Sequence, residues 1–374
     1  MSLKLEVGPT ILKLKTKNME NYLTSLFNKP VKIISIKKLG EGFHNAVFSI
    51  LIKKGKKDAE FIIRVVRGDT GWGHDYVSDR ASTLLLQHRL LNIAPKHTAR
   101  RSLDVFAILK NGEIVSLGNS IEFLNLAEKV SLKKWRPYSE DLFEIAKRGF
   151  LNEKDIKRCC IIADYISNLH SVKIKNENLY KRHIRDLIGH GEMIMGVIDT
   201  YPNPEELNFT SKEELMKIEV KAVEWRNRIK YLSHRLSRIH GDFHPFGNIL
   251  FNKNDKMLAI DQSREEYGEP ADDVTSLTIN YIFFSVWHYG EYKKPFSDLL
   301  EIFFERYFKK TKDEEMFKVM APFYAFRGLV VAHPLYYPDL NSFKRRKILN
   351  FVVNVLNIDE FDPSKITSYL EKAP

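Results

Sequence analysis

The chain has 374 residues, a hydrophobic fraction of 44% and two cysteines, the adjacent Cys159 and Cys160. This length predicts two lobes or domains, and the composition excludes a disordered chain. Adjacent cysteines exclude a disulfide framework and fit a reducing compartment. The first residues lack the apolar core of a signal peptide, and no apolar run reaches membrane-spanning length. We therefore expect a soluble, cytoplasmic protein without membrane contact.

The net charge of +11 is the feature that most directly bears on partners. It would suit nucleic acid, a membrane surface or nucleotide phosphates, but the lysines are dispersed along the chain, as on an ordinary solvated surface. The densest run, residues 53–57, stands where a hairpin turn belongs. We expect no nucleic-acid partner; that alternative ranks last and predicts affinity that falls steeply with salt.

The first third of the chain predicts a small, strand-rich lobe. An amphipathic helix is expected over 9–28, followed by a strand over 31–36. A glycine-bearing turn at 40–48 leads into a second strand through Leu51. The apolar strand 61–66 carries one charged side chain, Arg64, which is either functional or an edge arginine whose tip reaches solvent.

The next segments complete this lobe. A helix is expected over 75–92, and Asn111-Gly112 predicts a hairpin between strands 104–109 and 114–117. A last strand over 120–125 should lead out of the lobe. We place the boundary between a nucleotide-binding lobe, 1–124, and a helical lobe, 125–374.

From residue 139 onward the pattern is mostly helical. The expected helices share a 3.6-residue period and cover 156–171, 212–232, 275–287, 295–308, 317–331 and 342–356. His170, at the end of the first, is expected to cap or pack. The aromatic residues of the later helices are expected in the core: Tyr281, Trp287, Tyr324 and Phe326.

One stretch carries most of the chemical information, residues 238–250 with the sequence RIHGDFHPFGNIL. It is a loop between apolar flanks that holds one carboxylate, two imidazoles and an amide. A short hairpin later, the strand Leu258-Ala259-Ile260 ends at Asp261. Transfer of a phosphoryl group from a nucleotide requires a carboxylate near the acceptor hydroxyl and an Asn and an Asp that hold magnesium.

These segments resemble the aminoglycoside phosphotransferase/choline kinase-type family of small-molecule kinases. The matching motifs are 40–47 (GEGFHNAV), His240-Gly241-Asp242 with Asn248, Asp261, and 268–273 (GEPADD), in the family's order. The resemblance implies an α+β, two-lobed, protein-kinase-like fold. A small antiparallel sheet lobe would join a large, mainly helical lobe. It also implies transfer of the γ-phosphate of ATP, or of GTP, to a hydroxyl of a small molecule.

The resemblance assigns roles to several residues. Asp242 would be the catalytic base, Asn248 and Asp261 would bind Mg²⁺, and Asp273 would support the loop from beneath. The nucleotide-binding residues would be Gly40, Gly42, Phe43, Asn45 and Val47 over the phosphates, Arg64 on the phosphates, and Glu122 and Leu124 in the hinge beside the base.

The sequence departs from the family pattern in three places. Asn248 follows Asp242 by six residues, where five are usual; we expect a one-residue bulge that Gly247 permits. Arg64 stands where a lysine is common. The helix over 75–92 has no glutamate to pair with it, and Asp79 or Asp75 are the candidates.

For several other residues of the motifs the sequence leaves two roles open. His240 is expected to brace the backbone, whereas His244 could lie near the transferred phosphate or simply pack. Glu269 and Asp272 could contact a cationic substrate or stabilise a helix N-terminus. Arg327 and His333 could face the acceptor but are not assigned to the site.

Two other functions remain open. A nucleotide-binding pseudokinase-like module without turnover would explain the departures. A protein kinase is disfavoured because only six residues separate Asp261 from Gly268, too few for a peptide platform. The acceptor is left open among sugars, amino alcohols and nucleosides; polycationic aminoglycosides are disfavoured by the basic chain.

Overall fold

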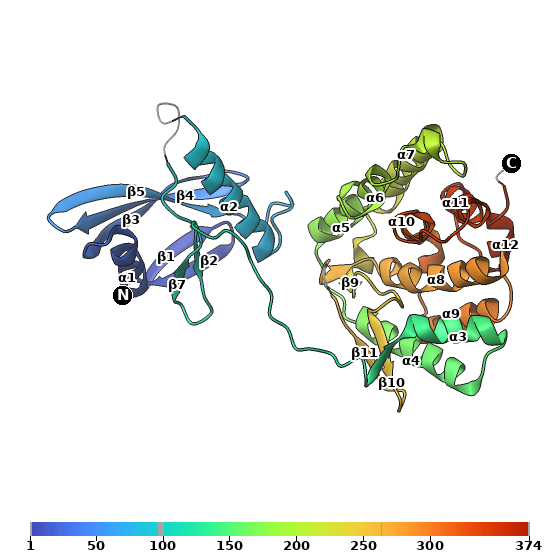
Figure 1. Ribbon diagram of the computed structural model, residues 1–374. Helices are drawn as coiled ribbons and strands as arrows, with labels where there is room; N and C mark the ends of the chain where they lie inside the picture. The colour runs from blue at the N-terminus through green and yellow to red at the C-terminus, as the bar shows by residue number, and fades with distance from the viewer. Residues whose placement is uncertain (1, 96–100, 263, 373–374) are drawn as a thin grey trace. The chain divides into compact units, whose positions relative to one another are not determined.

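The computed structural model describes residues 2–95, 101–262 and 264–372. The chain divides into two compact units, Met1–Glu128 and Lys129–Pro374, where the sequence had suggested a boundary after residue 124. Small antiparallel sheets and many helices make the architecture α+β, as predicted (Figure 1). In the described part of the chain, no helix combines the length and hydrophobicity needed to cross a bilayer.

The first unit contains seven strands and two helices among its described residues. The strands are β1 (Ser2–Val7), β2 (Thr10–Lys15), β3 (Val31–Glu41), β4 (Asn45–Lys54), β5 (Lys57–Val66), β6 (Phe106–Ile108) and β7 (Ile114–Ser116). The helices are α1 (Thr16–Phe27) and α2 (Val77–Ile93).

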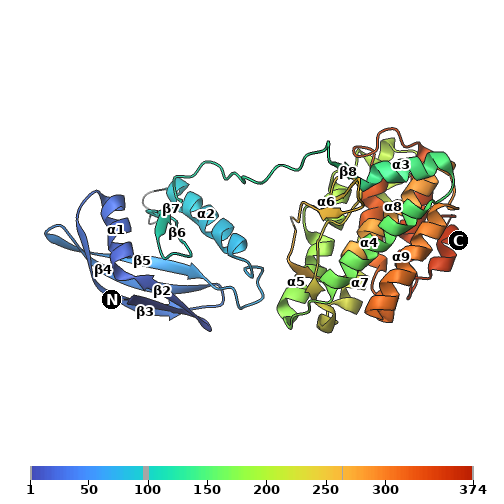
Figure 2. The same ribbon diagram turned by 90° about the horizontal axis from the view of Figure 1, so that it is seen from below.

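The centre of this unit is the antiparallel sheet β3-β4-β5 (Figure 2). Alternate residues of β4, among them Ala46, Phe48, Ile50 and Ile52, are buried in one apolar cluster that also contains Met19 of α1. This alternation places one face of the sheet on the core; on the other face of β4, Val47 and Leu51 are half-buried. The basic run 53–57 forms the β4–β5 turn, as predicted, with Gly55 at a φ of +62°.

Two expected elements of this unit are wrong. Residues 10–15 are strand β2, because the alternating Leu12 and Leu14 pair with β1 and the helix begins only at Thr16. Residues 120–125 form no strand; no pairing is found for them in the described chain, and the side chain of Ile121 is fully exposed. Apolar alternation alone does not make a strand that has no partner.

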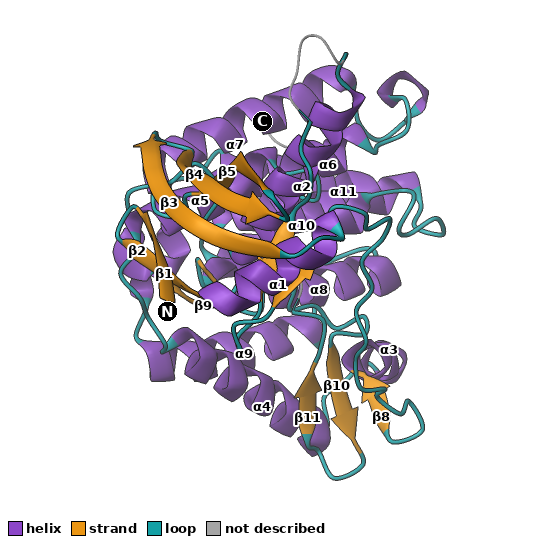
Figure 3. Ribbon diagram, turned by 90° about the vertical axis from the view of Figure 1, so that its left-hand side faces the viewer, coloured by secondary structure: helices purple, strands orange, loops and turns teal. Residues whose placement is uncertain are grey.

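The second unit is mainly helical (Figure 3). Its α-helices are α3 (Tyr138–Arg148), α4 (Glu153–His170), α5 (Glu177–Gly189), α6 (Ile194–Asp199), α7 (Lys212–Ile229), α8 (Ala271–Tyr289), α9 (Phe296–Thr311), α10 (Ala321–Ala332), α11 (Ser342–Leu356) and α12 (Ile366–Tyr369). Its strands are β8 (Trp135–Pro137), β9 (Ser237–Arg238), β10 (Ile249–Asn252), β11 (Met257–Ala259) and β12 (Tyr267–Gly268).

The core of this unit surrounds α8. Its residues from Ala271 to Val286 are all buried, as expected for a helix covered on every side. Of the four aromatic residues predicted in the core, Tyr281, Tyr324 and Phe326 are fully buried, whereas Trp287 is only half-buried. The helices expected near 156–171, 212–232 and 342–356 are also present as α4, α7 and α11.

Two small ladders hold the motif segments in place. Strand β10 pairs with β11 and with β8, and β9 pairs antiparallel with β12. The loop 239–248 therefore begins at the ladder of β9 and β12 and ends at the ladder of β10 and β11. The segment 260–266 connects the same two ladders in return. This arrangement places the two motif segments next to each other.

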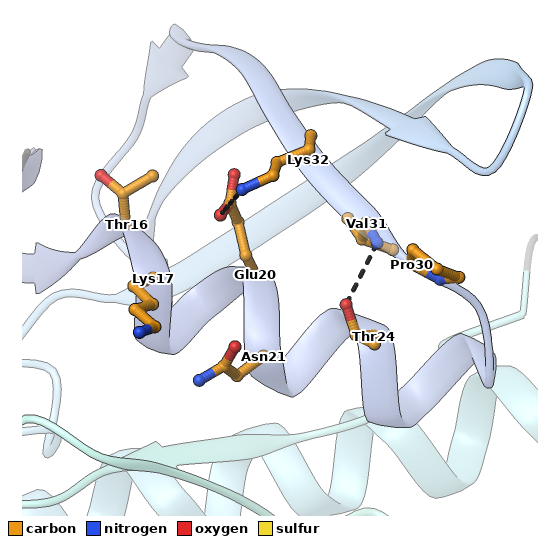
Figure 4. A pocket seen from close by; sticks show the side chains of 8 residues that line it. All are labelled: Thr16, Lys17, Glu20, Asn21, Thr24, Pro30, Val31 and Lys32. Atoms are coloured by element: carbon orange, nitrogen blue, oxygen red, sulfur yellow. Dashed lines mark hydrogen bonds and ion pairs between the residues drawn. The ribbon is translucent and has the colours of Figure 1, made fainter.

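A cavity of about 430 Å³ lies between α1 and the start of β3 (Figure 4). An ion pair of 3.2 Å joins Glu20 to Lys32 at its edge, and Thr24 Oγ1 accepts a hydrogen bond from the backbone N–H of Val31. None of the residues that line it belongs to the motifs described above. We do not assign a function to it.

Candidate functional site

The loop 239–248 is held by the first turn of α8. The carboxylate of Asp273 accepts hydrogen bonds from the backbone N–H groups of His240 (2.7 Å) and Gly241 (2.8 Å). Gly241 has a φ of +84°, a conformation that glycine adopts without strain. The supporting role that the sequence resemblance implied for Asp273 is thus present in the geometry.

Asp273 is itself fully buried and is contacted from behind by a histidine. His170 Nε2 lies 3.1 Å from its carboxylate, and His170 Nδ1 lies 2.8 Å from the hydroxyl of Tyr307. Burial alone would raise the pKa of Asp273, but the hydrogen bonds and charge of its partners outweigh burial and lower it. His170 is therefore a buried structural residue, in agreement with its predicted packing role.

Asp242 is the carboxylate of the loop, and solvent can still reach part of it. Its side chain is 16% exposed, and its Oδ1 accepts a hydrogen bond of 2.6 Å from Arg327 Nη1. Arg264 Nη2 and His244 Nε2 each lie 3.7 Å from the carboxylate. Burial raises the pKa of Asp242, but the two guanidinium groups outweigh it and the pKa is lowered. Asp242 is consequently ionised at neutral pH.

The pKa of His244 is lowered, whereas the pKa of a histidine that simply pairs with a carboxylate is raised. Burial lowers the pKa of its imidazole, and the positive charges of Arg327 and Arg264 lower it further, against the attraction of Asp242. The imidazole is therefore neutral at pH 7. Its Nδ1 accepts a hydrogen bond of 3.1 Å from the backbone N–H of Phe246, which leaves Nε2 facing Asp242.

Arg327 is the site residue that the sequence interpretation left unassigned. Its Nη2 donates to the carboxylate of Asp272 (2.7 Å) and to the carbonyl of Gly241 (3.0 Å), while Nη1 holds Asp242. Only 5% of the residue is exposed. The sequence did contain a signal for this role, since Arg327 is a single charged residue in the otherwise apolar stretch of α10. A charge that is buried requires a partner.

The neighbouring acids are structural. Glu269 is fully buried. It accepts two hydrogen bonds from the guanidinium of Arg235 and one from the hydroxyl of Tyr180. Asp272 is 1% exposed and pairs with Arg327. The possibility that these two acids contact a cationic substrate is therefore wrong, since neither carboxylate is accessible.

Gly247 has the unusual backbone angle that the bulge expected between Asp242 and Asn248 would need. Gly247 has a φ of +113°, and Asn248 Nδ2 donates a hydrogen bond of 2.9 Å to the backbone carbonyl of Asp242. The extra residue is thus accommodated without separating Asn248 from the loop. Because its amide nitrogen is used within the loop, the side-chain oxygen Oδ1 is the atom that remains for a cation.

Asp261 follows β11 and is exposed, as a strand-end carboxylate should be. It adopts a φ of +64°, which is uncommon for a residue other than glycine and is more frequent at functional positions. Among the described residues no group of three or more His, Cys, Asp or Glu side chains could hold a metal ion. A cation at Asn248 and Asp261 would need further ligands.

His240, which was expected to brace the backbone, packs in the core and contacts the loop backbone. It is fully buried, its ring lies against that of Phe243, and its Nδ1 accepts a weak hydrogen bond of 3.4 Å from the backbone N–H of Asp242.

In the first unit, the sheet register brings three predicted nucleotide residues together. Gly40 on β3 lies opposite Val47 on β4, and Val47 lies opposite Arg64 on β5. Directly opposed residues share a face of the sheet. Arg64 is exposed and forms no ion pair with any described residue. It therefore projects from the face opposite to the apolar cluster.

The turn between β3 and β4 contains the other predicted residues. The backbone N–H of Gly42 donates to the carbonyl of Asn45 (2.9 Å), and Phe43 is 73% exposed at the tip. Arg67, which the sequence interpretation missed, donates to the carbonyl of Gly42 (3.1 Å) and pairs with Asp69. It ties the glycine turn to the end of β5.

Three other residues predicted for the nucleotide site of this unit are Asp79, Glu122 and Leu124. Asp79, a candidate partner for Arg64, accepts a hydrogen bond from the backbone N–H of Tyr76 at the start of α2. Glu122 accepts one from the backbone N–H of Phe123, and Leu124 is 93% exposed. Both hinge candidates lie in irregular chain instead of the expected strand.

Comparison with known proteins gives matches only among solved structures. No protein-family model matches the sequence, and no curated protein matches it. The chain is similar to an ethanolamine kinase of Plasmodium vivax (15% identity, TM-score 0.35), covering 90% of this chain and 80% of that one. It is also similar to a glucosamine kinase (14% identity, TM-score 0.40; 88% and 92% covered).

A third similar structure is an amicoumacin kinase, solved in complex with AMP-PNP, Ca²⁺ and its ligand (12% identity, TM-score 0.37; 89% and 92% covered). All three proteins are small-molecule kinases, the class that the motifs of this sequence resemble.

Proposed function

We propose that this protein is a small-molecule kinase that transfers the γ-phosphate of ATP, or of GTP, to a hydroxyl group. The observation that carries the proposal is the loop 239–248. One buried carboxylate, Asp273, fixes its backbone, so that an ionised Asp242 and the amide of Asn248 are held on the same loop. Positioning and charge stabilisation account for most of the catalysis of phosphoryl transfer.

Asp242 would orient the acceptor hydroxyl and accept its proton. Arg327 occupies Oδ1, which leaves Oδ2 as the acceptor of the hydroxyl proton. The lowered pKa keeps this oxygen unprotonated at neutral pH. Because proton transfer occurs late in phosphoryl transfer, a weak base held in the correct position suffices. The neutral His244 lies on the same side of the carboxylate as Oδ2.

Asn248 and Asp261 fit the cation that such a reaction requires. Both present oxygen atoms, the ligand type that Mg²⁺ prefers, and Mg²⁺ commonly takes only one or two protein ligands beside water and phosphate oxygens. When bound, Mg²⁺ would neutralise the nucleotide phosphates.

The first unit would supply the nucleotide contacts. Gly40, Val47 and Arg64 share the face of the sheet opposite to the apolar cluster, and the turn of Gly42, Phe43 and Asn45 lies at its end. We assign the phosphates to these residues. We assign the nucleobase to the segment that contains Glu122 and Leu124.

A nucleotide-binding module without turnover is the second candidate. The ion pair of Asp242 with Arg327 favours it, because a carboxylate held by a guanidinium is a poorer base. Both candidates predict binding of ATP with Mg²⁺, and only the first predicts phosphate transfer.

The test combines binding with turnover. We would follow ³¹P NMR spectra of wild type and Asp242→Asn with ATP, Mg²⁺ and a pool of small hydroxyl compounds, and measure melting temperatures with the nucleotide. We expect a new phosphomonoester signal whose rate of formation falls roughly 10²- to 10⁴-fold in the variant. The matched control is Asp164→Asn, since Asp164 only pairs with Arg306 and Lys310 on the surface.

The outcomes separate the two candidates. Stabilisation of the wild type by ATP and Mg²⁺ without a phosphomonoester would favour the binding module. Failure of the nucleotide to raise the melting temperature would contradict both.

A further inference from the structure

The charge around Asp242 is unusual for a site that takes a cationic acceptor. The carboxylates of the surrounding segments are occupied by structural partners: Glu265 by His183, Glu269 by Arg235, Asp272 by Arg327 and Asp273 by the loop backbone. Glu192, which is exposed, is the other acid that acts on Arg264 electrostatically, beside Asp242 and Asp272. Apart from the base, these buried carboxylates are thus all paired, and the exposed Asp261 is assigned to the metal.

Arg264 forms no hydrogen bond to an oxygen atom among the described residues, although it pairs at longer range with Asp242. Its guanidinium lies 3.7 Å from Asp242, too far for a hydrogen bond, and its one hydrogen bond among the described residues is a contact of 3.5 Å from Nη1 to the sulfur of Met193. It also stacks on the ring of Phe326 at 5.3 Å. The side chain is only 18% exposed, and burial together with Arg327 lowers its pKa.

The position of Arg264 points to the acceptor and not to the metal. Its contacts, Met193 before α6 and Phe326 in α10, belong to the helical wall of the second unit. The candidate metal ligands Asn248 and Asp261 instead flank the β10–β11 hairpin. Asp242, Arg264 and His244 keep 16%, 18% and 29% of their side chains exposed, so a small molecule can reach all three.

We propose that the acceptor carries an anionic oxygen group, a carboxylate or a phosphate, that binds Arg264 while its hydroxyl lies at Asp242. The proposal rests on the kinase function given above. A planar guanidinium matches two oxygens of such a group, and partial burial strengthens the bond. An ammonium acceptor would be repelled by Arg264 and would find no free inner carboxylate.

The resting charge of the site supports the same choice. Two guanidinium groups, Arg264 and Arg327, face two carboxylates, Asp242 and Asp272. Arg327 hydrogen-bonds both carboxylates, so Arg264 is the cation that an anionic group on the acceptor would pair with.

The experiment uses acceptors that share a skeleton and differ in charge. One set is D-gluconate, D-glucitol and 1-amino-1-deoxy-D-glucitol, and a second is D-glycerate, glycerol and 3-amino-1,2-propanediol, with sn-glycerol 3-phosphate added to distinguish phosphate from carboxylate. Phosphate transfer from ATP and Mg²⁺ is measured for wild type, Arg264→Gln and Arg264→Lys. Melting temperatures are measured with AMP-PNP and Mg²⁺, with and without each compound.

We expect the wild type to prefer the anionic members by at least tenfold in kcat/KM, or in stabilisation where turnover is too slow. Arg264→Gln should lose this preference and Arg264→Lys should keep part of it. Stabilisation of all three proteins by the nucleotide alone shows that the variants fold and bind nucleotide, and phosphate transfer by the wild type tests the kinase proposal; absence of nucleotide stabilisation in the wild type would contradict that proposal separately.

Three results would overturn the inference about the acceptor. The first is a wild-type preference for neutral or cationic members. The second is an equal loss for all members in Arg264→Gln, which would assign Arg264 to the transferred phosphate. The third is that no anionic compound stabilises the wild type more than it stabilises Arg264→Gln.

Discussion

Arg327 Nη1 donates a hydrogen bond of 2.6 Å to Oδ1 of Asp242, although 85 residues separate the two along the chain. The same guanidinium reaches Asp272 and the carbonyl of Gly241. A planar fork of this kind fixes position as well as charge. Arg327 is therefore a positioning residue, which holds the proposed base and the backbone before it in one orientation.

Replacement of Arg327 by lysine should shift the pH dependence of catalysis. The lost fork weakens the interaction that lowers the pKa of Asp242, so the acid limb of kcat/KM should move to higher pH, by about one unit. Arg327→Met should shift it further but should also cost about 3–5 kcal/mol of stability, since it leaves buried carboxylates unpaired. Arg306→Lys, at a surface ion pair, is the control. An unmoved acid limb in folded Arg327→Lys would contradict the positioning role.

Removal of Asp273 should destabilise the second unit. In Asp273→Ala, the backbone N–H groups of His240 and Gly241 and the ring of His170 all lose a buried acceptor. The free energy of unfolding, measured with urea, should fall by about 3 kcal/mol. Asp164→Ala, which removes an exposed partner of Arg306, should cost no more than about 1 kcal/mol. Equal losses in the two variants would show that Asp273 does not support the loop.

The expected bulge at Gly247 should tolerate no side chain without strain. A Cβ at this position would meet no atom within 4 Å, so the penalty in Gly247→Ala comes from the φ of +113°. We expect a loss of about 1–2 kcal/mol in the free energy of unfolding. Gly189, at the end of α5, is equally open but lacks a positive φ. Gly189→Ala should be neutral or slightly stabilising; an undisturbed Gly247→Ala would argue against the bulge.

Asn248→Ala and Asp261→Asn should weaken the dependence of nucleotide binding on Mg²⁺. The Mg²⁺ concentration that gives half of the ATP-induced rise in melting temperature should increase at least about tenfold in each. Asp255→Asn is the control, because Asp255 lies at the turn of the same hairpin and pairs with Arg158 and Lys157. A response equal to that of Asp255→Asn would remove both residues from the proposed metal site.

His183 should make stability depend on pH above neutrality. Burial lowers the pKa of its imidazole, but the adjacent Glu265 outweighs burial and raises the pKa to about 9. The folded protein thus binds this proton more tightly than the unfolded chain, whose histidine titrates near 6.5. The stabilisation is complete below pH 6.5 and is lost as the pH rises through 9.

The corresponding measurement is urea unfolding between pH 6 and 9.5 for wild type and His183→Asn. The decrease in stability with rising pH should be smaller in the variant. His234→Gln, which alters an exposed histidine paired with Glu315, should follow the wild type. A wild-type slope retained in His183→Asn would assign the pH dependence to other groups.

Sequence patterns determined the features of this protein that depend on nearby residues. The 3.6-residue periods of α4, α7 and α11, the turns at Gly55 and Gly112, and the unusual backbone angle at Gly247 were all predictable. Backbone angles and the apolar face of a helix are set within a few residues, so they can be read without knowledge of the fold. Asp273 could be assigned only because the motif around it resembled a known pattern.

The tertiary structure decided which side chains meet. Residues 10–15 became a strand because β1 was available to pair with them, and 120–125 did not, since no segment of the described chain pairs with them. The partnership of Arg327 with Asp242 joins α10 to a loop far away in the sequence, and no local period encodes it. Whether a charge is buried beside a base or exposed to water depends on the packing of separate elements, and that packing alone assigned Arg327 and Arg264 to the site.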